Sequence, residues 1–420
     1  MRIGVLVGLL GVCVVAAGQT TKEELLRDVN QAGGVYLAYR EPEVAETVAP
    51  EGYEAFYVSM YARHGSRYLI GDGDYRWVLD AMRGADEAGA LSVLGRDVLG
   101  RLERLWPVVE GRGGDLSPVG ERQHRGLAER MYGRWPGVFG TGRRVSARST
   151  LVPRCAMSMA AFGSRLQGLA PGLEIRYEAS RRYMGYMSFK TEEAKAFGDN
   201  ERGPWVADYK RFEREKVRPE RFVGALFEDG GYVRERVDGA ALMWGFYWIA
   251  VDMQDIECGE GFYDLFTGDE LFDLWQVNNY NFYVHDANHA YGKGVVVASA
   301  KSLVRNIIES ADEAIRDTSV AATLRFGHDG NIIPLLALMG VEDFGVSVAK
   351  PEECSGAWCD FKAAPMAANL QMVFYRNGAG EVIVKFLHNE REVHVGVGTE
   401  MFPYYRWEDV RAYYMGVVGE

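Results

Sequence analysis

Residues 61–68 read Tyr-Ala-Arg-His-Gly-Ser-Arg-Tyr and directly follow the apolar run Ala-Phe-Tyr-Val-Ser-Met at 55–60. Such a run is typical of a strand that is buried on both faces, as in a parallel sheet. Where this strand is expected to end, His64 lies between Arg63 and Arg67. Guanidinium groups match the oxygens of a phosphate, and an imidazole is able to attack phosphorus. The segment therefore predicts a phosphate-handling site at the end of a strand.

A second histidine, His328, occupies the same kind of position. Residues 321–326 have strand character and are followed by Gly327-His328-Asp329-Gly330 and by another helix to about Met339. In open α/β sheets, ligands bind at the carboxyl ends of strands, often against helix N-termini. A reaction at phosphorus needs a nucleophile, cationic groups and a proton donor for the leaving oxygen. We therefore expect His328 to supply a further cation and Asp329 to supply the acid.

A third cluster contains Arg148-Ser149-Thr150 and Arg154, near the start of a predicted helix. Arg154 falls in the first turn of that helix, so we expect it to contact the anion. Arg148 has a structural alternative, because an arginine at this place often ties loops together by pairing with a buried carboxylate.

Strand and helix signals at both ends of the chain enclose a mostly helical middle. Further strands are expected near 144–147, 370–375 and 381–387. Helix-like spacing is found at 117–135, 152–166, 192–198, 207–217, 220–228, 231–252, 269–280 and 298–316. This pattern predicts an α/β fold with a mostly parallel central sheet flanked by helices and an inserted, mainly helical lobe. The core would comprise 19–180 and 297–420, and the lobe 181–296.

Residues 1–18 have the pattern of a secretory signal peptide: one positive charge, a short apolar run and small residues at the end. The apolar run is too short to span a bilayer comfortably, and no later segment qualifies as a membrane span. We therefore expect a periplasmic or secreted protein. Export permits disulfides, with Cys354 and Cys359 as the favoured pair, whereas Cys155 is expected to be a buried thiol.

The overall charge restricts the partners of this chain. Its 420 residues contain 47 Lys and Arg against 59 Asp and Glu, a net charge of −12. Such an acidic chain is a poor candidate for binding nucleic acid, so any phosphate must be held by a local arginine cluster. Neither the cysteine nor the histidine spacings form a zinc signature. We expect neither metal nor cofactor, and the oligomeric state is left open.

Taken together, these motifs resemble the acid-phosphatase branch of the histidine phosphatase superfamily, which includes phytases and multiple inositol polyphosphate phosphatases. The resemblance runs from about residue 50 to 410. It rests on five blocks in order: 63–67, 116–120 with Gln123, 148–150 with Arg154, 328–329, and 367–371.

The resemblance implies a role for each matching residue. His64 would be the nucleophile that becomes phosphohistidine, and Asp329 would protonate the leaving oxygen. The phosphoryl group would be held by Arg63, Arg67, Arg154 and His328. The partner would be a small phosphate monoester.

The substrate stays open at this point. Tyr68 after the second arginine is similar to the inositol polyphosphate phosphatases, whereas the His-Asp pair is similar to ordinary acid phosphatases and many phytases. Phytate or another inositol polyphosphate is favoured. A broad-specificity acid phosphatase is the alternative, and a non-catalytic phosphate-binding protein is the second alternative.

Overall fold

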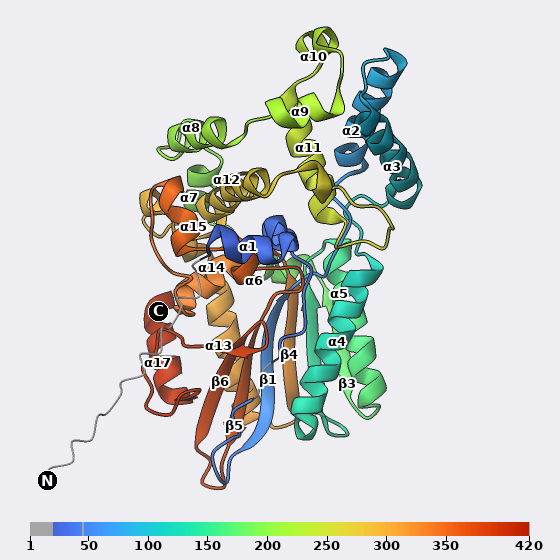
Figure 1. Cartoon of the computed structure of the whole chain (residues 1–420). Helices are drawn as coiled ribbons and strands as arrows, with labels where there is room; N and C mark the ends of the chain where they lie inside the picture. Colours follow the sequence, from blue (N-terminus) through green and yellow to red (C-terminus); the bar gives the residue numbers. More distant parts are fainter. Residues whose placement is uncertain (1–19, 44–45, 420) are drawn as a thin grey trace, which may run out of the picture.

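The computed structural model describes residues 20–43 and 46–419. The predicted signal peptide at 1–18 lies outside the described residues. A single sheet runs through the lower half of the molecule (Figure 1), with the strand order β3-β2-β4-β1-β5-β6-β7 and β8 beside β6. The strands are β1 (Glu54–Arg63), β2 (Arg144–Ser149), β3 (Glu174–Ala179), β4 (Val320–Gly327), β5 (Asn369–Arg376), β6 (Val382–His388), β7 (Arg391–Glu392) and β8 (Tyr404–Arg406).

The sheet is parallel on one side of β1 and antiparallel on the other. Strands β3, β2, β4 and β1 run parallel, whereas β5 pairs antiparallel with β1 and β6 pairs antiparallel with β5. This confirms the expected α/β fold. β1 is the central strand, and its last seven residues are buried, as expected for a strand covered on both faces.

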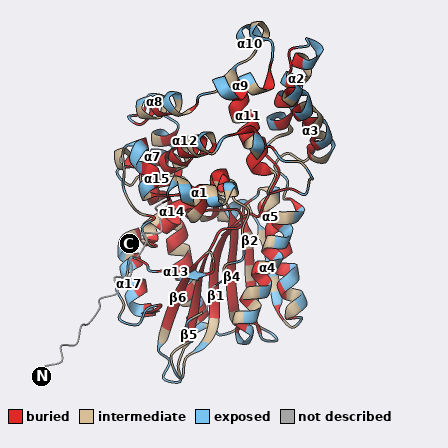
Figure 2. Cartoon of the chain, in the orientation of Figure 1, coloured by how far each residue is buried: buried red, intermediate tan, exposed pale blue. Residues whose placement is uncertain are grey.

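Alternate residues of β1 face two different helical layers. Val58 and Met60 pack with α4 (Pro118–Arg134) and α5 (Pro153–Leu169). Tyr57 and Tyr61 pack on the opposite side with α13 (Lys301–Arg316), α14 (Asp329–Met339) and α17 (Trp407–Val418). Figure 2 shows the central strands of the sheet mostly buried between these layers.

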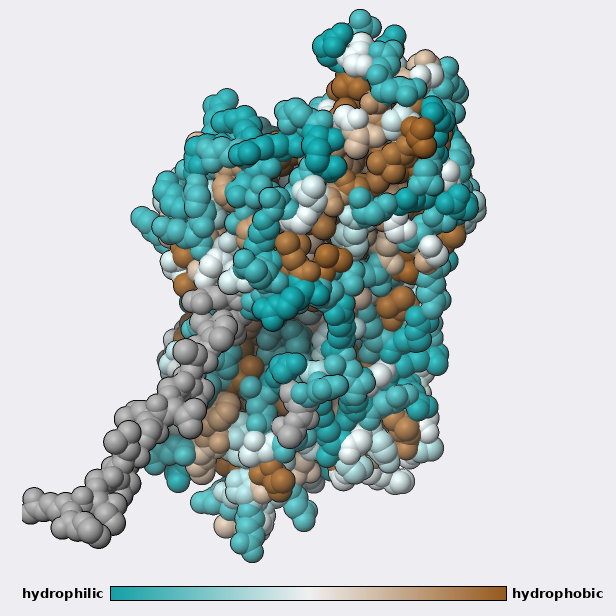
Figure 3. All heavy atoms as spheres, in the orientation of Figure 1, coloured by the Kyte–Doolittle hydropathy of each residue, from teal (hydrophilic) through white to brown (hydrophobic). Residues whose placement is uncertain are grey.

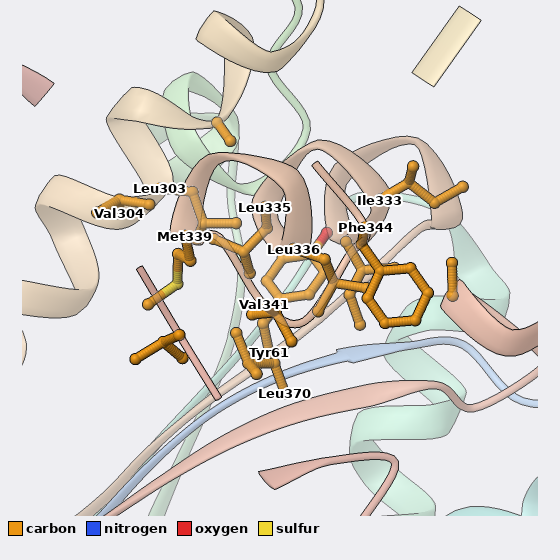
Figure 4. Close-up of a cluster of buried hydrophobic side chains, with 14 of the residues drawn as sticks. Tyr61, Leu303, Val304, Ile333, Leu335, Leu336, Met339, Val341, Phe344 and Leu370 are labelled. Atoms are coloured by element: carbon orange, nitrogen blue, oxygen red, sulfur yellow. The ribbon is translucent and has the colours of Figure 1, made fainter. Parts of the chain in front are cut away.

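Helix α14 begins at Asp329 and packs against the sheet. Its apolar side chains, among them Leu335, Leu336 and Met339, fill the space between α13 and the sheet residues Tyr61 and Leu370 (Figure 4). Each of these side chains is at most 2% exposed. Burial of this kind stabilises the helix position, so the start of α14 is held against the end of β4.

A second group of helices lies above the carboxyl ends of the parallel strands (Figure 1). The helices of this part and of the remaining connections are α1 (Lys22–Arg27), α2 (Asp72–Glu87), α3 (Val93–Val109), α6 (Met184–Met187), α7 (Glu192–Gly198), α8 (Val206–Lys216), α9 (Glu220–Leu226), α10 (Gly230–Arg236), α11 (Gly239–Asp252), α12 (Gly268–Asp286), α15 (Pro351–Ala357) and α16 (Asp360–Ala363). Short 3₁₀ helices include η1 (Val29–Tyr36) and η4 (Tyr263–Leu265).

The upper helices come from two parts of the chain that are far apart in the sequence. α2 and α3, which were not expected from the sequence, share a buried apolar cluster with α9 and α11. The expected helix at 231–252 is interrupted before α11, where the Asp238 side chain accepts a hydrogen bond from the Ala241 N–H at 3.0 Å. Asp is a favoured helix cap, so a new helix begins there. The proposed division into a core and a lobe at 181–296 stays a prediction.

The cysteines correct one expectation. All four in the described residues are free, so the predicted Cys354–Cys359 disulfide is wrong for this structure. The Asn279 side-chain amide donates to Cys354 Sγ at 3.5 Å, while Cys359 Sγ donates to the Ser355 carbonyl at 3.8 Å. The two sulfur atoms therefore serve different partners. Cys155 is buried, as expected.

The outer surface is mostly polar in the view of Figure 3, with scattered hydrophobic patches over the upper helices. In residues 20–43 and 46–419, no helix combines enough length and hydropathy to cross a membrane.

Candidate active site

The ends of β1 and β4 bring the two histidines together. The parallel register places Arg63 opposite Gly327, and the His64 N–H donates to the Gly327 carbonyl at 2.9 Å. The rings of His64 and His328 follow directly, with 5.7 Å between their centroids and an edge-on arrangement. Two segments that are more than 260 residues apart in the sequence thus form one site. We call the group of His64, Arg63, Arg67, Arg154, His328 and Asp329 the strand-end site.

A close backbone contact shapes the loop after β1. A Cβ atom added to Gly65 would lie 2.5 Å from the Gly120 carbonyl oxygen, and one added to Gly120 would lie 2.2 Å from the Ser66 oxygen. Both positions therefore require glycine. The Ser66 N–H also donates to the Gln123 side chain at 2.8 Å. The start of α4 thus holds the loop that carries His64.

His64 is arranged as a neutral nucleophile. It is 2% exposed, and its Nδ1 lies 2.9 Å from the Gly65 carbonyl oxygen. A carbonyl only accepts, so Nδ1 carries the proton and Nε2 keeps its lone pair. Burial first, and then the charges of Arg63, Arg154 and Arg67, hold the pKa of His64 well below its usual value. The imidazole is therefore unprotonated even in mild acid.

Arg63 is fully buried and connects three parts of the chain. Its Nη1 donates to the carbonyls of Val35 and Ala364, the latter at 2.9 Å. Its Nη2 forms an ion pair with Asp329 Oδ2 at 2.7 Å. Burial acts to raise the pKa of Asp329, but the charge of Arg63 and, after it, the neighbouring imidazole of His328 outweigh burial, so the pKa is lowered. In the free site, Asp329 is a carboxylate.

The other two arginines differ in how they are held. Arg67 donates to the Tyr68 carbonyl at 2.7 Å and to the Tyr36 hydroxyl at 2.9 Å, and its guanidinium lies 4.7 Å from the Tyr36 ring centroid. Arg154 is half-buried, and its Nε has no hydrogen-bond partner within the described residues. Burial and the charge of Arg67 lower the pKa of Arg154. Both effects favour an anion at this point.

His328 corrects one expectation about charge. Its Nε2 lies 3.1 Å from the Thr150 hydroxyl, and its backbone N–H donates to the Tyr61 hydroxyl at 3.2 Å. Burial first, and then Arg154 and Arg63, lower the pKa of His328 to about 4 against the opposing charge of Asp329. Above that pH the free site holds a neutral imidazole, so His328 is a hydrogen-bonding group there rather than a cation.

The structure brings together all six residues chosen from the sequence. It also adds groups that no motif indicated: Tyr36 from η1, and Asp252 and Asp255 at the end of α11. Within residues 20–43 and 46–419, no group of three or more His, Cys, Asp or Glu side chains has the arrangement of a metal site. Function without a metal or cofactor stays a prediction, as does the exclusion of nucleic acid.

Arg148 lies outside the strand-end site. Its side chain donates to the Tyr186 hydroxyl at 2.9 Å, lies 4.4 Å from the Tyr183 ring centroid and pairs with Glu178 at 3.6 Å. These contacts connect β2 with β3 and the segment after it. They contrast Arg148 with Arg154, whose Nε has no hydrogen-bond partner in the part of the chain that the structure describes.

We expect Arg154→Ala to lower kcat/KM by about 100-fold or more, because a cation that faces the phosphoryl group is lost. Arg148→Ala should keep kcat/KM within about threefold and instead lower Tm by a few degrees, since it loses only structural contacts. Steady-state kinetics and thermal unfolding of both variants check this pair. The reverse pattern would show that the two roles are exchanged.

The family model of the histidine phosphatase superfamily (branch 2) matches residues 243–389. This segment contains His328 and Asp329 as well as strands β4, β5 and β6. The match is to a superfamily of phosphatases, so the chain is similar to that superfamily over the segment that carries His328 and Asp329.

Individual relatives resemble the chain over most of its length. Multiple inositol polyphosphate phosphatase 1 of Gallus gallus is 24% identical over 398 residues, which is 90% of this chain and 85% of the relative. The multiple inositol polyphosphate phosphatase of Bifidobacterium longum, solved with inositol hexasulfate, superposes with a TM-score of 0.76 at 16% identity, covering 91% of this chain and 97% of that one. A phytase from D. castellii gives a TM-score of 0.70 at 14% identity, with coverages of 95% and 87%.

Proposed function

We propose that the protein is an exported phosphomonoesterase that hydrolyses inositol polyphosphates, phytate among them, through a phosphohistidine at His64. One observation carries the proposal: the Nδ1 contact with the Gly65 carbonyl leaves Nε2 unprotonated in the midst of three arginines. The substrate class is supported by the names of the relatives from Gallus gallus and Bifidobacterium longum. Export is supported by the composition of residues 1–18.

In the first step, the His64 Nε2 lone pair forms a bond to phosphorus while the bond from phosphorus to the substrate oxygen breaks. Arg63, Arg67 and Arg154 balance the charge on the phosphoryl oxygens, and His328 donates a hydrogen bond. Asp329 gives its proton to the leaving alkoxide. The arriving phosphate occupies Arg63 and adds negative charge, which raises the pKa of Asp329 from its low value in the free site.

In the second step, water takes the place of the leaving alcohol. The Asp329 carboxylate accepts one proton from the water, its oxygen bonds to phosphorus, and the bond to His64 Nε2 breaks. The lone pair returns to the imidazole, and inorganic phosphate leaves. Asp329 thus acts as the acid in the first step and as the base in the second.

The test is activity of the purified protein on phytate and on p-nitrophenyl phosphate, side by side and with EDTA present. We expect turnover of both and a higher kcat/KM for phytate. A clear preference for p-nitrophenyl phosphate would support the broad-specificity alternative. No turnover of either would support the phosphate-binding alternative, and strong inhibition by EDTA would overturn the metal-free mechanism.

A further inference from the structure

Two buried aspartates lie next to the strand-end site and take no part in the steps above. Asp252 is the last residue of α11, and Asp255 follows one turn later, with its N–H donating to the Asp252 carbonyl at 2.8 Å. Both are 0% exposed. Charged residues are almost never fully buried unless they are paired, and neither carboxyl forms an ion pair in the described residues.

Asp255 holds the start of the segment 66–69, which carries Arg67. The Ser66 hydroxyl donates to Asp255 Oδ1 at 2.5 Å and accepts from the Gln123 side-chain amide at 2.8 Å. The Ser117 hydroxyl donates to the Asp255 backbone carbonyl at 2.5 Å. The end of α11 and the start of α4 therefore meet at Ser66.

Asp252 holds the other end of the same segment through a tyrosine. The Tyr75 hydroxyl donates to Asp252 Oδ2 at 2.5 Å and accepts from the Leu69 N–H at 2.8 Å. The two carboxyl groups thus support both ends of a four-residue segment. Arg67, which is 4% exposed, lies between the two supports.

Each carboxyl group also has one oxygen, Asp252 Oδ1 and Asp255 Oδ2, that is buried and has no hydrogen-bond partner within the described residues. A buried carboxylate with an unpaired oxygen is costly, so protonation is favoured. Burial raises the pKa of Asp252 to about 7. Burial and then the charge of Asp252 raise the pKa of Asp255 well above its usual value.

The charged and titratable groups around the pair come from several elements, with Arg67 as the strongest opposing cation. They are Arg63 and Arg67 from the β1 loop, Tyr68, Asp74 and Tyr75 toward α2, and Cys258 and Tyr263 from the segment after α11.

We propose that Asp252 and Asp255 are positioning residues: in their acid form they hold the segment 66–69 so that Arg67 meets the phosphoryl group. Their ionisation places negative charge near Arg67 and weakens phosphate binding. The inference rests on the proposed function, because it assigns Arg67 to the phosphoryl group. Since the carboxyl groups have raised pKa values, their acid form persists through mild acid, and phosphate affinity falls as the pH rises through about 7.

The test measures the Kd of inorganic phosphate by calorimetry between pH 5 and 8.5 for the parent, Asp252→Asn, Asp255→Asn and the double variant. Asn keeps the shape and acceptor oxygen of the acid form but cannot ionise. We expect each variant to bind within about threefold of the parent at pH 5 and the double variant to bind about tenfold tighter than the parent at pH 8.5. The titration of phosphate itself is common to all four proteins and cancels.

Asp360→Asn is the matched control. Asp360 is likewise fully buried, with a pKa raised to about 7, and accepts from the Trp275 indole N–H at 3.0 Å. We expect this variant to keep the pH dependence of the parent. An equal change in Asp360→Asn, or a parent-like pH dependence in the double variant, would overturn the inference.

Tyr75→Phe provides an independent variant should the Asn variants fail to fold. It removes the hydrogen bond that lowers the pKa of Asp252, so the loss of phosphate affinity should move to higher pH. No movement would overturn the inference. A parent that binds phosphate with the expected pH dependence but hydrolyses nothing would contradict the proposed function alone.

Discussion

His64→Ala is expected to remove the covalent intermediate and to lower kcat by at least about 10⁴-fold on every substrate, since no other group replaces the nucleophile. Within the strand-end site, the only other imidazole belongs to His328, and its Nε2 is directed to the Thr150 hydroxyl. Rapid quenching at neutral or alkaline pH, followed by detection of phosphohistidine, should show label in the parent and none in the variant.

His394→Ala is the matched control for the nucleophile. His394 is exposed, follows the edge strand β7, and stacks on Phe402 with 3.9 Å between ring centroids. This variant should retain both label and turnover. Retention of most activity by His64→Ala would refute the assignment of the nucleophile.

Asp329→Asn is expected to affect substrates according to their leaving groups. An inositol alkoxide leaves only with a proton, whereas p-nitrophenolate leaves without one. We therefore expect a loss of roughly 10²–10⁴-fold in kcat on phytate and of less than about tenfold on p-nitrophenyl phosphate. The alkaline limb of the kcat profile on phytate should also flatten, because it would report loss of the Asp329 proton.

Equal losses on both substrates would instead mean that Asp329 positions Arg63 or His328 and that the proton comes from another group. The ion pair between Asp329 and Arg63 makes this a real alternative. Phosphate affinity distinguishes this variant from the α11 aspartates: Asp329→Asn should change kcat, whereas Asp252→Asn and Asp255→Asn should change the Kd of phosphate.

The parts of the fold that were predictable are those with a local pattern. β1 was readable as an unbroken apolar run, and α4 was readable from Ser117, whose hydroxyl accepts from the Gly120 N–H at 3.2 Å. α2 was not expected, although it carries a clear apolar stripe of Tyr75, Val78, Leu79 and Met82, all of them buried, and this periodicity is typical of a helix. α3 was harder to recognise because Pro107 stands inside the helix.

The strand-end site was predictable for a geometric reason. Parallel strands end at the same edge of a sheet, so groups that follow β1 and β4 must lie close together. No such rule applies to Asp252 and Asp255. They lie about 190 residues after Ser66 in the sequence, Asp252 at the end of the strongly apolar helix α11 and Asp255 just after it. Only tertiary packing brings them to the loop. The charge of His328 was equally hidden, because it depends on burial rather than on residue type.

The contact between Gly65 and Gly120 restricts how the chain can vary. A side chain at either position would occupy space filled by backbone, so changing both residues together offers no relief. Neither Gly65, in the loop after β1, nor Gly120, in α4, therefore tolerates a substitution made one residue at a time. A change of substrate preference, inherited or engineered, must come from side chains farther from this contact. Mutational libraries aimed at new substrates should keep these two glycines and vary residues of the surrounding helices.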